Sequence, residues 1–65
     1  MKANKSKIID LMCKRNMSQA QLARISGVRT ATITALLKGN QNPTIKTINK
    51  IALGLNCQPS DIVEV

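Results

Sequence analysis

Residues 19–38 read QAQLARISGVRTATITALLK, and this stretch decides the fold. Its apolar residues recur at helical spacing in two short runs, with a single glycine, Gly27, between them. Glycine tolerates a positive φ better than any other residue, so it suits the end of a helix and a tight turn. The stretch therefore predicts two short amphipathic helices joined by a turn of about three residues.

The residues just before this stretch carry start signals for the first helix. Ser18 is a good N-cap, and Gln21 follows it three residues later, which is the spacing of a capping box. Met17 and Leu22 occupy the two positions of a hydrophobic staple around that cap. The first helix is therefore expected from Gln19 to Ser26.

Four apolar positions meet the physical needs of such a helix pair. Ala23 is small where the two helices must cross closely, and Val28 can fill the space beneath the turn. Ile33 and Leu36 can anchor the second helix to a core. With the second helix beginning at residue 29 or 30 and ending near residues 38 and 39, the pattern is that of a helix-turn-helix.

Helical periodicity continues on both sides. It predicts helices over residues 5–14 and 45–55, the latter capped by Thr44, and a last short helix at residues 60–62 after Pro59. Residues 1–4 are expected to be loose, and the tail at residues 63–65 either forms a short strand or frays. The predicted fold is all-α, with five helices in one domain over residues 1–65.

Charge indicates the kind of partner. Ten Lys and Arg against three Asp and Glu give a net charge of +7, and Asp10 is the only acidic residue before residue 61. In so short a chain this balance favours a polyanion, with nucleic acid first, over a merely basic soluble surface.

Several function classes find no support. No histidine, few carboxylates and no phosphate-binding glycine loop argue against an enzyme or a cofactor site. Cys13 and Cys57 have no neighbouring metal ligands and indicate reduced thiols, with Cys57 favoured as a core residue over a redox centre. No signal peptide or membrane span is recognisable, so a cytoplasmic protein is expected.

The chain resembles the Cro/CI-type, or XRE-like, family of phage-repressor helix-turn-helix domains, and in particular its short single-domain members. The resemblance covers about residues 5–62 and is carried by Met17, Ser18, Gln19, Leu22, Ala23, Ser26, Gly27, Val28, Thr32, Ile33, Gly39, Asn42, Pro43, Thr44, Thr47, Lys50, Ile51, Ala52 and Leu55, together with residues 55–62. Two positions depart from the family pattern: Arg29 replaces a Ser or Thr cap of the second motif helix, and Leu37 replaces a common Glu.

The resemblance implies that the helix beginning near residue 29 enters the major groove of DNA. The groove-lining or base-reading positions would then be Arg29, Thr30, Ala31, Thr34 and Ala35. Independently, Arg can bind a guanine edge bidentately, while Thr and Ala can meet a thymine methyl group. Arg29 could equally contact a phosphate.

By the same resemblance, the residues that contact the DNA backbone would be Gln19, Lys38, Asn40 and Asn42. Lysine and amide side chains suit phosphate oxygens, which position a protein without reading sequence. For Gln19, a role in the helix cap remains the alternative.

A single motif buries only about 600–1,000 Å² on DNA, and a two-fold dimer doubles this area. We therefore expect a homodimer on a two-fold symmetric operator, acting as a repressor without a cofactor. The apolar candidates for its interface are Ile9, Ile62, Val63 and Val65. The competing hypothesis is an antitoxin or adaptor that uses the same fold for protein–protein interaction.

Overall fold

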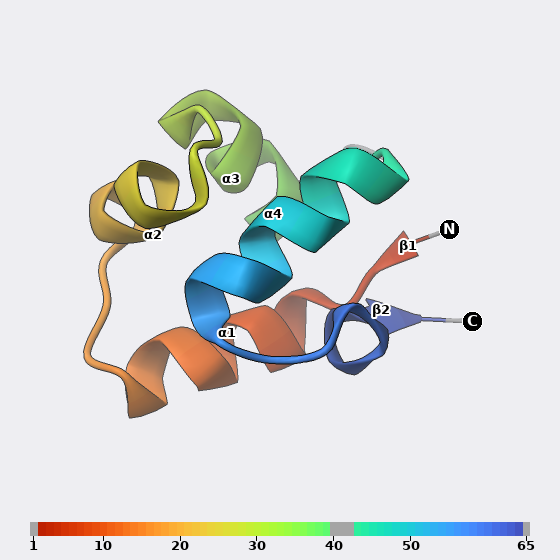
Figure 1. The fold of residues 1–65 in the computed structure, drawn as a ribbon, viewed down its shortest axis with the longest axis horizontal. Coiled ribbons are helices and arrows are strands. Elements are labelled where there is room, and N and C mark those ends of the chain that lie inside the picture. The colour runs from red at the N-terminus through yellow and green to blue at the C-terminus, as the bar shows by residue number, and fades with distance from the viewer. Residues whose placement is uncertain (1, 40–42, 65) are drawn as a thin grey trace.

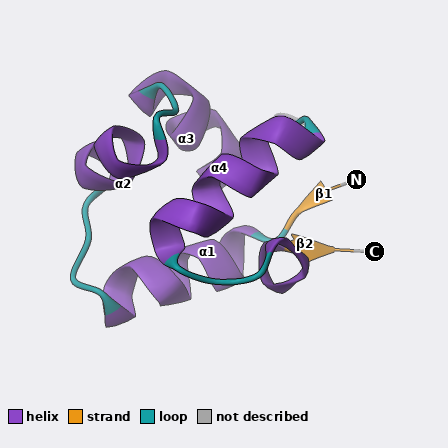
Figure 2. Ribbon diagram, viewed as in Figure 1, coloured by secondary structure: helices purple, strands orange, loops and turns teal. Residues whose placement is uncertain are grey.

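The computed structural model describes residues 2–39 and 43–64 of the chain (Figure 1). The elements in chain order are β1 (Lys2–Ala3), α1 (Lys5–Lys14), α2 (Gln19–Ser26), α3 (Thr30–Leu37), α4 (Ile45–Leu55), the 3₁₀ helix η1 (Pro59–Ile62) and β2 (Val63–Glu64). Helices make up nearly all of the regular structure, and the strands occur only at the two ends (Figure 2).

The prediction of a helical fold is confirmed, but the prediction of five α-helices is wrong. The structure has four α-helices in its described part, and the last predicted helix is the 3₁₀ helix η1. Its turn is closed by the Asp61 N–H, which donates to the Gln58 carbonyl oxygen at 2.9 Å. Such an i to i+3 bond suits a segment of four residues, which is barely one α-helical turn long.

The two ends of the chain pair in a small antiparallel sheet. Its strand β2 is the short strand given as one alternative for the tail, whereas β1 was not predicted. Lys2 lies opposite Glu64, and Ala3 opposite Val63. The backbone N–H of Asn4 also donates to the Ile62 carbonyl oxygen at 2.8 Å. The expectation that residues 1–4 are loose is therefore not met for residues 2–4, because their backbone groups bond to the end of the chain. Residues 1 and 65 lie outside the described part.

Most helix ends lie where the capping signals predicted them. Ser18 and Gln21 form the full capping box of α2, and Thr44 accepts a hydrogen bond from the Thr47 N–H at the start of α4. Gly27, at φ 73°, and Asn56, at φ 55°, end α2 and α4 in the left-handed conformation. These ends are determined by local sequence.

The core is aliphatic, and α4 crosses the middle of the view in Figure 1. It packs against α2 and η1, while α1 packs against α3 and η1. The buried residues of the hydrophobic core are Ile8, Met12, Leu22, Ala23, Ile33, Leu36, Ile48, Ile51, Ala52, Leu55 and Ile62.

The position of Ile62 corrects one of the predicted dimer contacts. Its side chain is fully buried, because η1 packs against both α1 and α4. It is therefore a core residue and is not available to a partner. Of the other predicted contacts, Ile9 is exposed, Val63 is half-buried and Val65 lies outside the described residues.

Candidate nucleic-acid interface

The turn between α2 and α3 is closed by main-chain hydrogen bonds. The N–H groups of Gly27 and Val28 both donate to the Ala23 carbonyl oxygen, at 2.9 and 3.2 Å. Val28 packs against the core beneath this turn. The left-handed Gly27 and these two bonds direct the chain from α2 into α3, as expected for a helix-turn-helix.

A glycine lets α2 lie close to α4, and sequence reasoning missed its role. A Cβ atom on Gly54 would lie 3.0 Å from the Ser26 Cβ and 3.3 Å from the Leu22 Cδ1. From the sequence alone Gly54 is only a poor helix former near the end of a helix. Its close approach depends on Ser26 and Leu22, 28 and 32 residues earlier in the chain. Together with buried Ala23, this small residue brings the motif onto the core.

Helix α3 is divided into an inner and an outer side. Ile33 and Leu36 are 1% and 2% exposed, and Leu37 packs against the core, which accounts for an apolar residue at that position. The predicted groove-lining residues lie on the remaining surface of the helix. Arg29, Thr30 and Ala31 are exposed, whereas Thr34 and Ala35 are half-buried. The structure thus has four of these residues on α3 and Arg29 at its N-cap.

The beginning of α3 has no side-chain cap. Arg29 has the extended N-cap conformation, at φ −65° and ψ 142°, but its side chain makes no capping hydrogen bond. The Thr32 and Ile33 N–H groups donate to the Arg29 carbonyl oxygen, at 3.0 and 3.2 Å. The first N–H groups of a helix have no acceptor within it, so those of Thr30 and Ala31 point out of the helix end.

Gln19 lies at the first position of α2 and is joined to α3 by a hydrogen bond between side chains. The Thr34 hydroxyl donates to the Gln19 Oε1 atom at 2.8 Å. The predicted phosphate contact and one of the predicted groove residues are therefore neighbours.

The other predicted backbone contacts follow α3. Lys38 is exposed and forms the C-cap of the helix, and Gly39 turns the chain in the left-handed conformation at φ 74°. Asn40 and Asn42 lie outside the described residues.

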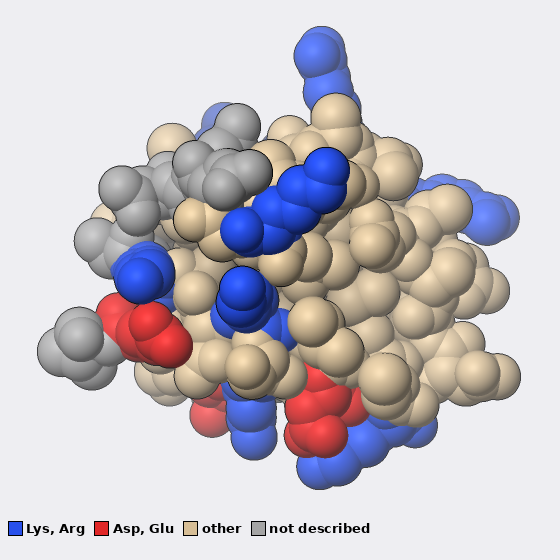
Figure 3. Space-filling view, turned by 180° about the vertical axis from the view of Figure 1, so that it is seen from behind, with Lys and Arg blue, Asp and Glu red and all other residues tan. Residues whose placement is uncertain are grey.

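Carboxylates are absent from the middle of the chain. Residues 11–60 contain seven Lys and Arg and no Asp or Glu. Helices α2 and α4 therefore carry only positive side-chain charges, and α3 is uncharged between Arg29 and Lys38 at its two caps. The upper half of Figure 3, the half that contains α2 and α3, accordingly shows Lys and Arg without Asp or Glu. In the described part of the chain the single ion pair lies within α1, between Lys14 and Asp10 at 3.2 Å. This charge distribution favours a polyanion on the α2–α3 side.

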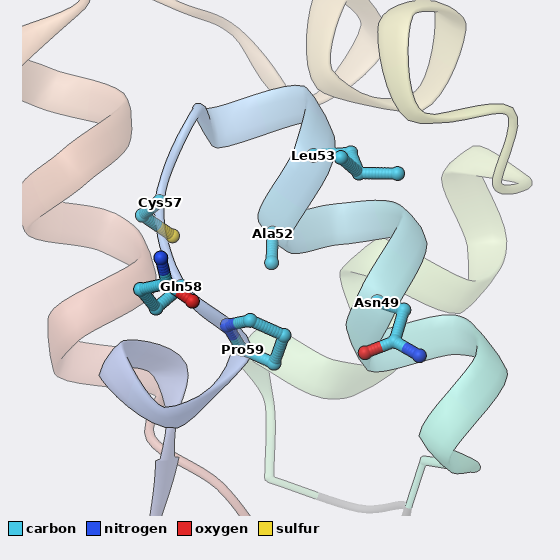
Figure 4. A pocket seen from close by; sticks show the side chains of 6 residues that line it. All are labelled: Asn49, Ala52, Leu53, Cys57, Gln58 and Pro59. Carbon is cyan, nitrogen blue, oxygen red and sulfur yellow. The ribbon is translucent and has the colours of Figure 1, made fainter.

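A surface cavity of about 400 Å³ lies elsewhere, between α4 and the loop that follows it (Figure 4). Its lining is uncharged and includes Asn49, Leu53 and Pro59. Cys57 also lines this cavity. The pKa of its thiol is raised, mainly because the thiol is partly buried and also because the Asp61 carboxylate lies nearby. The raised pKa keeps this thiol protonated, and a protonated thiol is a poor nucleophile.

A family model described as the Cro/C1-type HTH DNA-binding domain matches residues 7–65. The chain belongs to this family. The family is one of DNA-binding domains and not of enzymes.

Similar proteins agree with this assignment. This Cro/C1-type chain is 41% identical over 58 residues to an uncharacterized HTH-type transcriptional regulator from Archaeoglobus fulgidus, with 89% of this chain and 82% of the relative covered. It also resembles the solved structure of an HTH-family transcriptional regulator from Vibrio cholerae, with a TM-score of 0.83 and 31% identity over 89% of this chain and 33% of the other.

A third similar structure is the restriction-modification controller protein C.AhdI from Aeromonas hydrophila. The TM-score is 0.82 over 88% of this chain and 86% of that protein, and the 24% identity establishes a shared fold. Among the described residues, no helix is long and apolar enough to span a membrane, and no three potential metal ligands lie together.

Proposed function

We propose that this Cro/C1-type protein binds specific sequences of double-stranded DNA as a transcriptional regulator, with α3 in the major groove. The observation that carries the proposal is the outer side of α3. It presents Arg29 and small uncharged residues on a helix whose inner side is buried, within a stretch of chain that has no carboxylate. The major groove of B-DNA, about 12 Å wide, admits an α-helix.

Within this proposal the residues have separate roles. Arg29, Thr30, Ala31, Thr34 and Ala35 line the groove, and Arg29 reads a base edge. The DNA backbone is bound by a second set: Gln19, Lys38, Asn40 and Asn42. The exposure of Arg29 and Lys38 at opposite ends of α3 is compatible with one of them reaching a base and the other a phosphate.

The first experiment is selection of duplexes from a random pool by the purified protein, followed by titration of the selected duplex. We expect a two-fold symmetric motif that is bound more tightly than scrambled sequence at every salt concentration. No binding to any duplex at low ionic strength would falsify the proposed function.

Two variants separate the roles of the ends of α3. Arg29→Ala should cost about 1–3 kcal/mol on the selected duplex and relax its sequence preference. Lys38→Ala should weaken all duplexes alike and reduce the slope of log K against log salt by about one. Lys7→Ala, an exposed cation on α1, is the matched control and should change neither quantity. If Arg29→Ala behaves like Lys38→Ala, then Arg29 contacts a phosphate.

The protein is further proposed to act as a homodimer. Two copies place two α3 helices about 34 Å apart, on successive major grooves of one face of the duplex. Because Ile62 is buried, the interface must use other apolar surface. Ile9 at 44% exposed remains a candidate, and Ile45 and Leu53, at 64% and 80%, add larger apolar surface on α4. Leu53 is the most exposed of these apolar side chains, so it is the first position to test.

Sedimentation tests the dimer. We expect a dimer at high micromolar concentration, and a shift toward monomer in Leu53→Gln if α4 forms the contact or in Ile9→Gln if α1 forms it. A wild-type protein that sediments as a monomer both with and without DNA excludes the dimer.

Repression is the simplest consequence of occupancy, because a bound dimer that overlaps a promoter excludes RNA polymerase. A reporter placed behind the selected motif should lose expression when the protein is produced. A gain of expression would instead identify an activator.

A further inference from the structure

The hydrogen bond between Thr34 and Gln19 departs from what a threonine in a helix ordinarily does. Ser and Thr hydroxyls in helices commonly donate to the carbonyl oxygen four residues earlier. Ser26 does so in α2, where its hydroxyl donates to the Leu22 carbonyl oxygen at 2.6 Å. The Thr34 hydroxyl instead reaches Gln19, 15 residues away on another helix, at 2.8 Å. In the described part of the chain, no other side-chain hydrogen bond joins two helices.

This bond determines which way the Gln19 amide faces. A glutamine amide has an oxygen that accepts hydrogen bonds and an NH₂ group that donates two. With the Gln19 Oε1 atom bonded to Thr34, the Nε2 group is left to donate to a partner outside. Gln19 is exposed and lies at the first position of α2, at the positive end of that helix. An outward NH₂ group at this place suits a phosphate oxygen.

We propose that Thr34 is a positioning residue, whose hydroxyl holds the Gln19 amide so that its NH₂ group donates to a DNA phosphate. The inference rests on the proposed DNA binding and deepens it, because it gives the Thr34 hydroxyl a role other than reading a base. The bond links α3 in the groove to the start of α2 at the backbone. Thr34 therefore supports affinity for any duplex, while Arg29 supplies sequence preference.

The decisive variant is Thr34→Val, which removes the hydroxyl and keeps the branched shape. One hydrogen bond corresponds to about a three- to tenfold change in an equilibrium constant. We expect Thr34→Val to weaken the selected and the scrambled duplex by the same factor in this range, and Thr34→Ser, which keeps the hydroxyl, to bind within about twofold of wild type. Because Gln19 is neutral, the salt slope should stay unchanged, unlike that of Lys38→Ala.

A double-mutant cycle shows whether Thr34 acts through Gln19. In a Gln19→Ala background, Thr34→Val should cause no further loss of affinity, since the amide that it positions is gone. Additive losses, or a Thr34→Val variant that loses preference at one base pair, would overturn the inference. So would a Thr34→Ser variant as weak as Thr34→Val.

A measurement without DNA separates this inference from the proposed function. The side-chain NH₂ signals of Gln19 in a ¹H–¹⁵N spectrum should shift in Thr34→Val and return toward wild type in Thr34→Ser, and backbone signals far from the pair report whether the variants are folded. Signals that do not respond overturn the positioning role. Wild-type protein that binds no duplex removes the proposed function, and the phosphate contact with it.

Discussion

Helices α2 and α3 have the same length, eight residues each, but they are held in place in different ways. Both ends of α2 are stabilised by their own sequence, through the capping box of Ser18 and Gln21 and the left-handed Gly27. α3 has no side-chain cap at Arg29, and it depends on the burial of Ile33 and Leu36.

The difference shows how the motif can combine order with an accessible surface. α2 brings its own stability and provides a fixed base for the turn. α3 is held in place by its buried residues Ile33 and Leu36, so its first turn and its outer side make no contact on which its position depends. The N–H groups and the guanidinium at its start therefore remain available to a partner.

The largest effect should come from removing the anchor of α3. Leu36→Ala should lower the free energy of unfolding by about 2–5 kcal/mol, since it leaves a cavity in the core. A chain of this length has only roughly 3–10 kcal/mol in total, so much of the protein should unfold near room temperature. Urea denaturation followed by circular dichroism measures this. Leu37→Ala, on the same helix but half-buried, is the control and should cost clearly less.

The contact of α2 with α4 should be next in size. Gly54→Ala gains helix propensity worth about 1 kcal/mol, but it pushes a methyl group against Ser26 and Leu22, at a cost of about 1–3 kcal/mol. Ser26 cannot easily yield, because the contact is with its Cβ atom next to the α2 backbone. We expect a net destabilisation of about 1 kcal/mol by urea denaturation. Asn49→Ala, on the exposed side of α4, should stay near wild type, and a stabilised Gly54→Ala would mean that α2 can shift away from α4.

The caps of the two helices provide a matched pair. Ser18→Ala should cost about 1 kcal/mol, since it removes the side-chain acceptor of the capping box. Arg29→Ala changes the N-cap of α3, where no such bond exists, and should alter the free energy of unfolding by less than about 0.5 kcal/mol. Equal losses in the same denaturation experiment would contradict the contrast between the two helices.

The fold could be predicted wherever its determinants lie close together in the sequence. The capping box at Ser18, the turn at Gly27 and the cap at Thr44 each depend on residues within five positions of one another. A strand at the C-terminal tail was one of the two predicted alternatives, but its pairing with β1 could not be predicted. A strand of two residues has no periodicity, and β1 forms only when the folded core brings both chain ends together. Ile62 was misplaced for a related reason: an isolated apolar residue in a four-residue turn does not reveal which side faces the core.

The site was predictable to the same extent. The sequence and its family resemblance brought Gln19 and the residues of α3 into one motif, and the structure has them on adjacent helices. The sequence could not show that Thr34 bonds to Gln19, because a hydrogen bond between side chains depends on how two helices cross. The sequence showed Arg29 as a departure from the family pattern, but it did not show that the N-terminus of α3 has no side-chain cap as a result.

The smallest expected effect tests whether the open start of α3 serves a partner. Arg29→Ser places a hydroxyl where it can accept from the Ala31 or Thr32 N–H, in an N-cap conformation that already exists, and should stabilise the protein by about 0.5–1 kcal/mol. The same variant should weaken binding to the selected duplex, since it removes the guanidinium and occupies an N–H group at the helix end. Urea denaturation and duplex titration measure the two quantities, with Arg29→Ala separating loss of the guanidinium from gain of the cap. If Arg29→Ser is more stable and binds as well as wild type, the uncapped start has no bearing on DNA binding. If stability rises while affinity falls, the protein forgoes a capping bond at the residue that its function requires.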